Sequence, residues 1–287
     1  MPGRIALVTD STAMLPTSVA TERGIAVVPL QVVVGNDVYD DGSPEVAPAR
    51  IAAALKEFQP VSTSRPAPAV LSEVYERLAG EGATEIVSVH LSGQMSGTYE
   101  AAQLAAREAP VAVYPVDTGQ VGVATGYAVQ SAADVVDRGG STAEVIAAVR
   151  RRAAGASSLF YVDTLDYLRR GGRIGAAAAI LGGALSVKPL LTIADGRVST
   201  LEKVRTAGRA LGRLEELAVE AAGSGPVDVC VSHLANADRA EALADRLRER
   251  LSSQLAGELL FTELGAVLGA HVGPGMVAVA VSPRPLG

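Results

Sequence analysis

Hydroxyl-bearing residues and glycines gather where apolar runs of the sequence end or where a helix is expected to begin. They are Ser11 and Thr12, Thr63 and Ser64, and Ser92, Gly93, Ser96 and Gly97. In α/β sheets, ligands bind beyond the carboxyl ends of the strands, where hydroxyl groups and the first amides of a helix hold an anion. We therefore expect a carboxylate or a phosphate as the ligand. The other interpretation is that these Ser and Thr side chains only cap helices.

The segment that contains Ser92 and Ser96 favours a ligand role over simple capping, because its two glycines permit close approach of the backbone. Its spacing matches neither the phosphate-binding loop nor the dinucleotide fingerprint. It also differs from the nucleophile elbow of hydrolases, in which the serine stands at another position. Nucleotide binding therefore lacks support.

The three histidines are His90, His233 and His271, and none has metal-ligand spacing to another His or to Cys230. We accordingly expect no metal and no cofactor. For His90 and His233, at the ends of expected strands, a structural role is the simpler interpretation. His271 lies in the glycine-rich segment 269–275, which we expect to be a loop, and its N–H could meet an anion.

A cluster of three arginines and one separate arginine are further candidates for contact with an anion or a partner. Arg169, Arg170 and Arg173 directly precede the uncharged run 174–187. Such a cluster is usually a solvated face, yet its position beside the most apolar stretch also suits the rim of an apolar site. Arg205 is either an ion-pair partner of Glu202 or the planar group that recognises a carboxylate.

Composition excludes several classes of function. The chain has 287 residues and a net charge of -6, with no Trp and three Phe, which argues against a nucleic-acid surface. Cys230 is the only cysteine, so no intramolecular disulfide forms, as expected in a reducing compartment. The run 174–187, at about 14 residues, is shorter than the roughly 20 that span a bilayer. The start of the chain lacks a signal-peptide pattern. We expect a cytoplasmic protein with at most transient membrane contact.

The elements that position these residues follow from hydrophobic patterning. In the first half, strands at 5–9, 27–34, 86–91 and 111–116 alternate with amphipathic helices. Ser141 and Glu144 form a capping box at the start of one helix. This alternation predicts an α/β domain over residues 1–155, with a mostly parallel sheet covered by helices on both faces.

The second half, residues 156–287, has a different pattern. Strands at 190–194 and 197–203 flank Asp195-Gly196, which predicts a type I′ hairpin. Helices are expected at 207–221 and 236–251, the latter capped by Asn236. Strands at 227–231, 259–262 and 276–281 complete a mixed sheet in a second α/β domain. The cleft between two such domains is a common place for a ligand.

Taken in order, segments along the whole chain resemble the DegV family of bacterial fatty-acid-binding proteins. The matching segments are Asp10-Ser11-Thr12 with Leu15-Pro16, Val28-Pro29-Leu30, Thr63-Ser64 with Pro66, Leu91-Ser92-Gly93 with Ser96-Gly97-Thr98, Asp163-Thr164-Leu165 with Leu168 and Gly171-Gly172-Arg173, Lys188-Pro189, and Gly269-Ala270-His271 with Gly273-Pro274-Gly275. Each segment alone is unspecific, but their order and coverage make the resemblance specific. Met14 and Arg65 depart from the pattern, Arg65 by replacing a usual uncharged residue.

The resemblance implies a tunnel between the two α/β domains that holds one acyl chain. The length of the tunnel would depend on residues such as Ile180, Leu181 and Leu185. The residues implied to bind the ligand are Thr63, Ser64, Ser92, Gly93, Ser96, Arg205 and His271. Among these, Thr63 and Ser92 would bond the carboxylate, and Arg205 and His271 would belong to the polar network around it. The resemblance also implies that the bound acid is presented to a fatty-acid kinase, with Arg169, Arg170 and Arg173 as docking residues.

A long-chain fatty-acid carrier without catalysis of its own is therefore the first hypothesis. The second is an acyl hydrolase, with Ser92 or Ser96 as nucleophile and His271 as base. The third is a sensor of small anions, in which phosphate replaces the carboxylate.

Overall fold

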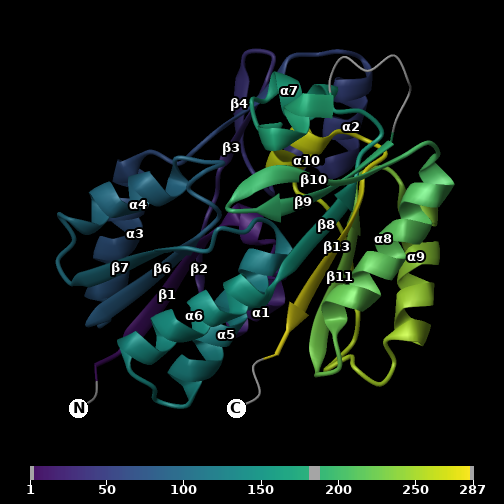
Figure 1. Cartoon of the computed structure of the whole chain (residues 1–287). Helices are drawn as coiled ribbons and strands as arrows, with labels where there is room; N and C mark the ends of the chain where they lie inside the picture. Colours follow the sequence, from purple (N-terminus) through teal and green to yellow (C-terminus); the bar gives the residue numbers. More distant parts are fainter. Residues whose placement is uncertain (1–2, 181–187, 285–287) are drawn as a thin grey trace. The chain divides into compact units, whose positions relative to one another are not determined.

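The computed structural model describes residues 3–180 and 188–284 (Figure 1). Two compact units make up the chain. Unit 1 contains residues Met1–Gln31 and Ser64–Ala154, and unit 2 contains Val32–Thr63 and Gly155–Gly287. Leu181 and Leu185, which were expected to affect the length of the acyl chain, lie outside the described residues.

Unit 1 is built on a four-stranded sheet in which every pair of neighbouring strands is parallel. Its order is β2 (Ala26–Val28), β1 (Ile5–Asp10), β6 (Glu85–His90) and β7 (Ala112–Asp117). The carboxyl ends of β1, β6 and β7 therefore lie side by side at one edge of the sheet, where ligands of parallel sheets bind.

Helices cover both faces of this sheet, as the alternation of strands and helices predicted (Figure 1). Ala6 and Val8 face α3 (Pro68–Gly80) and α4 (Thr98–Ala106), whereas Leu7 between them faces α5 (Val123–Asp137) and α6 (Thr142–Gly155). The short elements η1 (Ser11–Ala13) and α1 (Thr17–Glu22) follow β1. The capping box is present, since the Ser141 amide donates to Glu144 Oε2 over 2.7 Å.

Unit 2 contains a six-stranded mixed sheet, as predicted. Its order is β10 (Arg197–Val204), β9 (Lys188–Ala194), β8 (Ser157–Tyr161), β13 (Val277–Pro283), β11 (Val227–His233) and β12 (Leu260–Glu263). Only the β11–β12 pair is parallel. The β9–β10 hairpin turns at Asp195 and Gly196 with φ of 50° and 74°, which confirms the predicted type I′ turn.

The core of unit 2 forms between this sheet and two helices, α8 (Ala207–Ala222) and α9 (Ala237–Arg250). Leu214 of α8 and the α9 pair Leu243 and Leu247 are fully buried against Val229 and Val279 of the sheet. Helix α10 (Ala266–Val272) contacts α2 (Pro48–Lys56) and α7 (Asp166–Arg170). The 3-10 turns η2 (Pro44–Val46) and η3 (Gly175–Ile180) complete the unit.

The expected single strand 27–34 is wrong, because the chain leaves the first sheet at Pro29-Leu30. Proline has no N–H to donate to a sheet, so β2 stops at Val28. The chain then forms β3 (Gln31–Val34), which pairs with β4 (Asp37–Asp40) and β5 (Val61–Ser64) in a separate three-stranded sheet. With α2 packed on α10, residues 32–63 group with unit 2, although the predicted division at 155 and 156 placed them in the first domain.

Two expectations about the last third of the chain are also corrected. Residues 269–272 are helical and only the following glycines form a loop, because Ala266–Val272 pack as α10 against α2 and α7. Asn236 stands at the amino end of α9 but does not cap it with its side chain; its Nδ2 instead donates to the Gly275 carbonyl over 2.7 Å. In the ranges 3–180 and 188–284, no helix has the length and apolar character needed to cross a membrane.

Candidate functional site

The first polar cluster is centred on Thr63 and His271 in unit 2. Thr63 lies in β5 and His271 in the last turn of α10, and Thr63 Oγ1 lies 2.8 Å from His271 Nε2. Sequence analysis assigned both residues to the ligand, and the structure brings them into direct contact. Thr63 is only half-buried, and its hydroxyl group has the capacity for a further hydrogen bond beside the one to His271.

Gly171 and Arg173 pack on the other side of the His271 ring. A Cβ atom on Gly171 would collide with His271 Nδ1, so the ring can occupy its position only because residue 171 is glycine. Arg173 donates through one guanidinium nitrogen to the Gly171 carbonyl over 2.6 Å. Arg173 therefore belongs to the surroundings of His271, whereas the sequence grouped it with Arg169 and Arg170 as a docking residue.

Burial and charge keep His271 neutral. Burial, with a further contribution from the positive charge of Arg173, lowers the pKa of His271 to about 4. Nδ1 is buried and has no hydrogen-bond partner among the described residues. An unpaired buried N–H is rarer than an unpaired acceptor, which favours the tautomer with its proton on Nε2. Nε2 then donates to Thr63, and the Thr63 hydroxyl is left as a donor for an anion.

The loop after α10 is held by contacts that explain several of the matched segments. The Tyr167 ring packs on Gly273, which has a φ of 74° and no room for a side chain. Asp163 accepts hydrogen bonds from the Tyr161 hydroxyl and from Lys188 Nζ. A Cβ atom on Gly275 would collide with Asp163. These contacts fix the carboxyl end of the helix that carries His271.

The second polar cluster is the loop 91–97 of unit 1, between β6 and α4. Three successive amides of the loop are bonded to neighbouring elements. Leu91 N donates to Asp10 Oδ2 over 3.2 Å, Ser92 N to the Gln120 carbonyl over 2.8 Å, and Gly93 N to Asp117 Oδ2 over 3.1 Å. The backbone around Ser92 is consequently fixed from three sides.

His90 has a buried structural role in the same edge of the sheet. His90 Nδ1 lies 2.9 Å from Asp10 Oδ2, and Nε2 lies 2.8 Å from Ser88 Oγ, which accepts from the Tyr75 hydroxyl over 2.8 Å. Tyr75, Ser88, His90 and Asp10 all have no exposed surface. Each hydroxyl and the imidazole can donate to the next group toward Asp10, so every polar group in this hydrogen-bonded series has a partner.

Hydrogen bonds within the protein engage Ser96, Ser64 and Arg65. Ser96 Oγ lies 2.8 Å from Thr98 Oγ1 and accepts from the Thr98 amide, so it stabilises the first turn of α4 in the manner of a cap. The exposed Ser64 donates to the Arg65 carbonyl. Arg65 donates to the Gly97 carbonyl over 3.2 Å and to Glu100 over 2.8 Å. Arg65 thus holds the far end of the Ser92 loop.

The remaining predicted cations lie on exposed parts of unit 2. Arg205 forms no hydrogen bond or ion pair within the described residues, and the partner considered for it, Glu202, is paired with Arg213 instead. Arg169 forms an exposed ion pair with Asp166. The Arg170 guanidinium carbon lies 5.9 Å from the ring centres of Phe58 and Tyr167.

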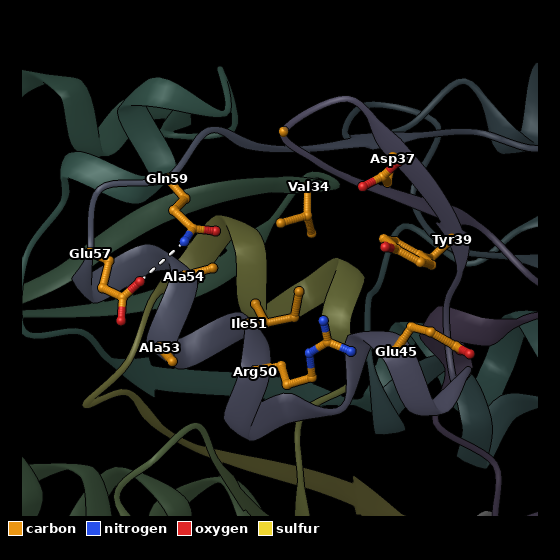
Figure 2. A pocket seen from close by; sticks show the side chains of 11 residues that line it. Val34, Asp37, Tyr39, Glu45, Arg50, Ile51, Ala53, Ala54, Glu57 and Gln59 are labelled. Atoms are coloured by element: carbon orange, nitrogen blue, oxygen red, sulfur yellow. Dashed lines mark hydrogen bonds between the residues drawn. The ribbon is translucent and has the colours of Figure 1, made fainter.

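A surface pocket is lined by none of the residues of the two polar clusters (Figure 2). It has a volume of about 380 Å³, and it lies between α2 and the β3–β4 hairpin. Val34, Ile51 and Ala54 form its apolar part, and Arg50 and Tyr39 extend into it from its edge. No motif in the sequence indicated this pocket, and none of the predicted ligand-binding residues lines it.

Sequence reasoning missed Asp10, Asp117, Tyr167 and Gly171 as residues that hold the two clusters. Asp10 and Asp117 could have been found, because each stands at the carboxyl end of a predicted parallel strand. Gly171 stands in one of the matched segments but was given no role there, and Tyr167 gave no signal. Their contacts join α7 to α10 across about a hundred residues of chain, a separation that local patterning does not reach.

A family model described as "Uncharacterised protein, DegV family" matches residues 4–284. A DegV domain-containing protein of Streptomyces coelicolor is 52% identical over 284 residues, which cover 99% of this chain and 100% of the relative.

Solved structures show the same fold. A DegV family protein from Thermus thermophilus, described by its fatty-acid binding, is 35% identical, with a TM-score of 0.91 over 98% of this chain and 100% of that one. DegV from Bacillus subtilis, described as a fatty acid binding protein, is 30% identical, with a TM-score of 0.89 over 98% and 100% of the two chains.

Proposed function

This chain belongs to the DegV family, and we propose that it binds a long-chain fatty acid through the carboxylate and the acyl chain. Its similarity to the fatty-acid-binding proteins of Thermus thermophilus and Bacillus subtilis supports this proposal. We propose Thr63 and Ser92 as the hydroxyl donors to the carboxylate. His271 acts through Thr63, and Gly93 and Ser96 shape the loop around Ser92.

The observation that carries the proposal is the hydrogen bond between Thr63 Oγ1 and His271 Nε2. A neutral His271 that donates to Thr63 leaves the hydroxyl proton of Thr63 to the ligand. Hydrogen bonds to charged groups are stronger than those between neutral groups, so a carboxylate is the partner that gains most from this donor. Arg173, beside His271, adds a positive charge to the surroundings.

The acyl chain supplies most of the binding free energy in this account. Each buried methylene contributes about 0.8 kcal/mol, so a chain of roughly 14 methylenes gains about 11 kcal/mol before ordering costs are subtracted. A carboxylate buried with such a chain needs compensating hydrogen bonds. The tunnel that the resemblance implies for the acyl chain stays a prediction.

We also propose that the bound acid is presented to a fatty-acid kinase, with Arg169 and Arg170 as docking residues. Both side chains are exposed, and Phe58, which lies under Arg170, is 76% exposed. Charge complementarity with an acidic partner would raise the association rate. Replacement of both arginines by Glu should abolish phosphorylation of bound acid by such a kinase and leave fatty-acid affinity unchanged. A loss of affinity would contradict the docking role.

A pair of ligands tests the proposed carboxylate site directly. The chain, freed of lipid, is titrated with a fluorescent long-chain fatty acid, which is then displaced either by hexadecanoate or by its methyl ester. The two competitors share the acyl chain, but only the acid carries a charge. We expect displacement by the acid at much lower concentration. Equal displacement by the two would mean that the head group is not recognised.

The hydrolase hypothesis gains no support from the geometry around His271. A catalytic histidine is oriented by a group on its second ring nitrogen. His271 Nδ1 has no hydrogen-bond partner among the described residues, and Nε2 is bonded to Thr63.

A further inference from the structure

The pocket between α2 and the β3–β4 hairpin combines an apolar floor with charged side chains (Figure 2). Ile51 and Ala54 of the floor are buried, and Val34 completes it. The volume of about 380 Å³ lies at the small end of the range for ligand sites, which is roughly 300–1,000 Å³. Every lining residue falls between positions 34 and 59, so the pocket is contained in unit 2. Its size suits a small molecule.

On one side of the pocket, the side chains can hold a carboxylate and an ammonium group together. Figure 2 shows the Arg50 guanidinium and the Tyr39 hydroxyl directed toward its centre, with the Asp37 carboxylate next to Tyr39. Asp37 and Tyr39 share one face of β4, because they are two positions apart in a strand. Among the residues that the structure describes, none hydrogen-bonds or ion-pairs with the side chains of Asp37, Tyr39 or Arg50. The guanidinium fork and the hydroxyl suit a carboxylate, and Asp37 suits a cation.

The opposite side of the pocket offers only acceptors. Gln59 Nε2 donates to Glu57 Oε2 over 3.1 Å, and this bond turns the amide oxygen of Gln59 toward the pocket (Figure 2). A tight turn after α2 places both residues: the amides of Phe58 and Gln59 donate to the carbonyls of Leu55 and Ala54 over 3.2 and 2.9 Å. Phe58 has a φ of 58° in this turn, a conformation that glycine usually supplies at the end of a helix. A carboxylate and an amide oxygen side by side attract a cation.

We propose that this pocket binds a free basic α-amino acid, with L-lysine as the type ligand. Its carboxylate is bound by Arg50 and Tyr39, and its α-ammonium by Asp37. Its aliphatic stem lies over the apolar floor, as lysine stems do on apolar surfaces. Its terminal ammonium is bound by Glu57 and Gln59. None of the residues proposed to bind the fatty acid lines this pocket, so the amino-acid site does not depend on the proposed function.

The charges of the ligand and of the pocket match one by one. Asp37 and Glu57 present two negative charges to the ligand, and Arg50 presents one positive charge. A basic amino acid carries two positive charges and one negative charge. Glu45 also lines the pocket, but its side chain extends away from Arg50 in Figure 2. A neutral amino acid would leave Glu57 without a partner, and a diamine would leave Arg50 without one.

Three ligands separate these contacts. L-norleucine has the carbon skeleton of L-lysine without the terminal ammonium, and cadaverine is L-lysine without the carboxylate. Isothermal titration calorimetry on the full chain measures the affinity of each. We expect L-lysine to bind with a Kd below about 1 mM, and each of the other two to bind at least about tenfold more weakly.

Two substitutions assign the ends of the ligand to their partners. Glu57→Gln removes the charge, but the amide oxygen that it introduces still accepts from Gln59, so L-lysine should bind only as weakly as L-norleucine binds the wild-type chain. Arg50→Gln should likewise reduce its affinity to that of cadaverine. Both side chains are exposed, and thermal unfolding checks that each variant is folded. The control is Glu76→Gln, which removes an exposed charge on α3 and should leave L-lysine binding unchanged.

The wild-type chain alone can overturn the proposal. L-lysine that gives no binding at several times the expected Kd would leave the pocket without this ligand. Equal affinities for L-lysine, L-norleucine and cadaverine would show that the charged ends are not recognised. A folded Glu57→Gln or Arg50→Gln chain that binds L-lysine as tightly as the control would also contradict the site.

Discussion

Thr63 and His271, separated by 208 positions in the sequence, are joined by a 2.8 Å hydrogen bond between Oγ1 and Nε2. The contact joins β5 to α10 near the end of the chain, and both residues belong to unit 2. The structure thus brings together two residues that sequence analysis selected for separate reasons, a hydroxyl group before a helix and a histidine among glycines.

Removal of the Thr63 hydroxyl should weaken fatty-acid binding by about tenfold or more, since a hydrogen bond to a charged group contributes roughly 1.5–3 kcal/mol. Thr63→Val removes the hydroxyl at nearly constant volume, and Thr63→Ser restores it. Titration with a fluorescent fatty acid measures both. Affinity that is unchanged in Thr63→Val would contradict the assignment of Thr63 to the carboxylate.

The low pKa of His271 has a consequence for stability against acid. The unfolded chain takes up a proton at His271 near pH 6.5, whereas in the folded chain the pKa is about 4. Protonation therefore favours the unfolded state as the pH falls from 6.5 to 4, and about 3 kcal/mol of stability is lost across that range. Above pH 6.5, His271 makes no pH-dependent contribution to the free energy of unfolding.

His271→Gln should remove this part of the pH dependence. Urea denaturation at a series of pH values measures the free energy of unfolding of both chains. We expect the difference between them to change between pH 6.5 and pH 4 and to stay constant above. Parallel curves for the two chains would show that His271 titrates normally in the folded state.

Gly171→Ala tests the packing that positions the imidazole. The added Cβ atom would collide with His271 Nδ1, so the ring has to leave the position in which Nε2 bonds Thr63. We expect a loss of about 1–3 kcal/mol of stability from this overpacking, together with weaker fatty-acid binding.

Gly212→Ala in α8 is the matched control for this substitution. No atom lies within 4 Å of its added Cβ, and alanine stabilises a helix relative to glycine. Thermal unfolding and fatty-acid titration should therefore show no loss in Gly212→Ala. If Gly171→Ala also lost neither stability nor fatty-acid affinity, the His271 ring would not depend on the space that Gly171 leaves.

Elements specified by local residues could be predicted from the sequence. Asp195-Gly196 fixes its hairpin because both residues must adopt positive φ, and the reciprocal bonds of Ser141 and Glu144 fix the start of α6. Hydroxyls and glycines after β6 indicated the Ser92 loop, because the carboxyl ends of parallel strands meet at one edge of the sheet. Thr63 instead lies within β5 of the separate three-stranded sheet.

Features specified by distant contacts could not be predicted in this way. Residues 269–272 contain turn-forming glycine, yet packing against α2 and α7 makes them helical. Asn236 has the residue type of a cap, but its amide bonds the Gly275 carbonyl of a distant loop. Arg173 looked like one of three docking cations, and only the folded chain places it beside His271. In each case tertiary packing overrides the local preference.

Native mass spectrometry of the gently purified chain, followed by solvent extraction and lipid analysis, tests the central claim most directly. The account predicts one fatty acid for each chain, released on denaturation, and the analysis would also give the length of its acyl chain. A chain that carries no lipid, and that takes up none when long-chain fatty acids are added, would contradict the proposed function and leave only the fold and the family in place.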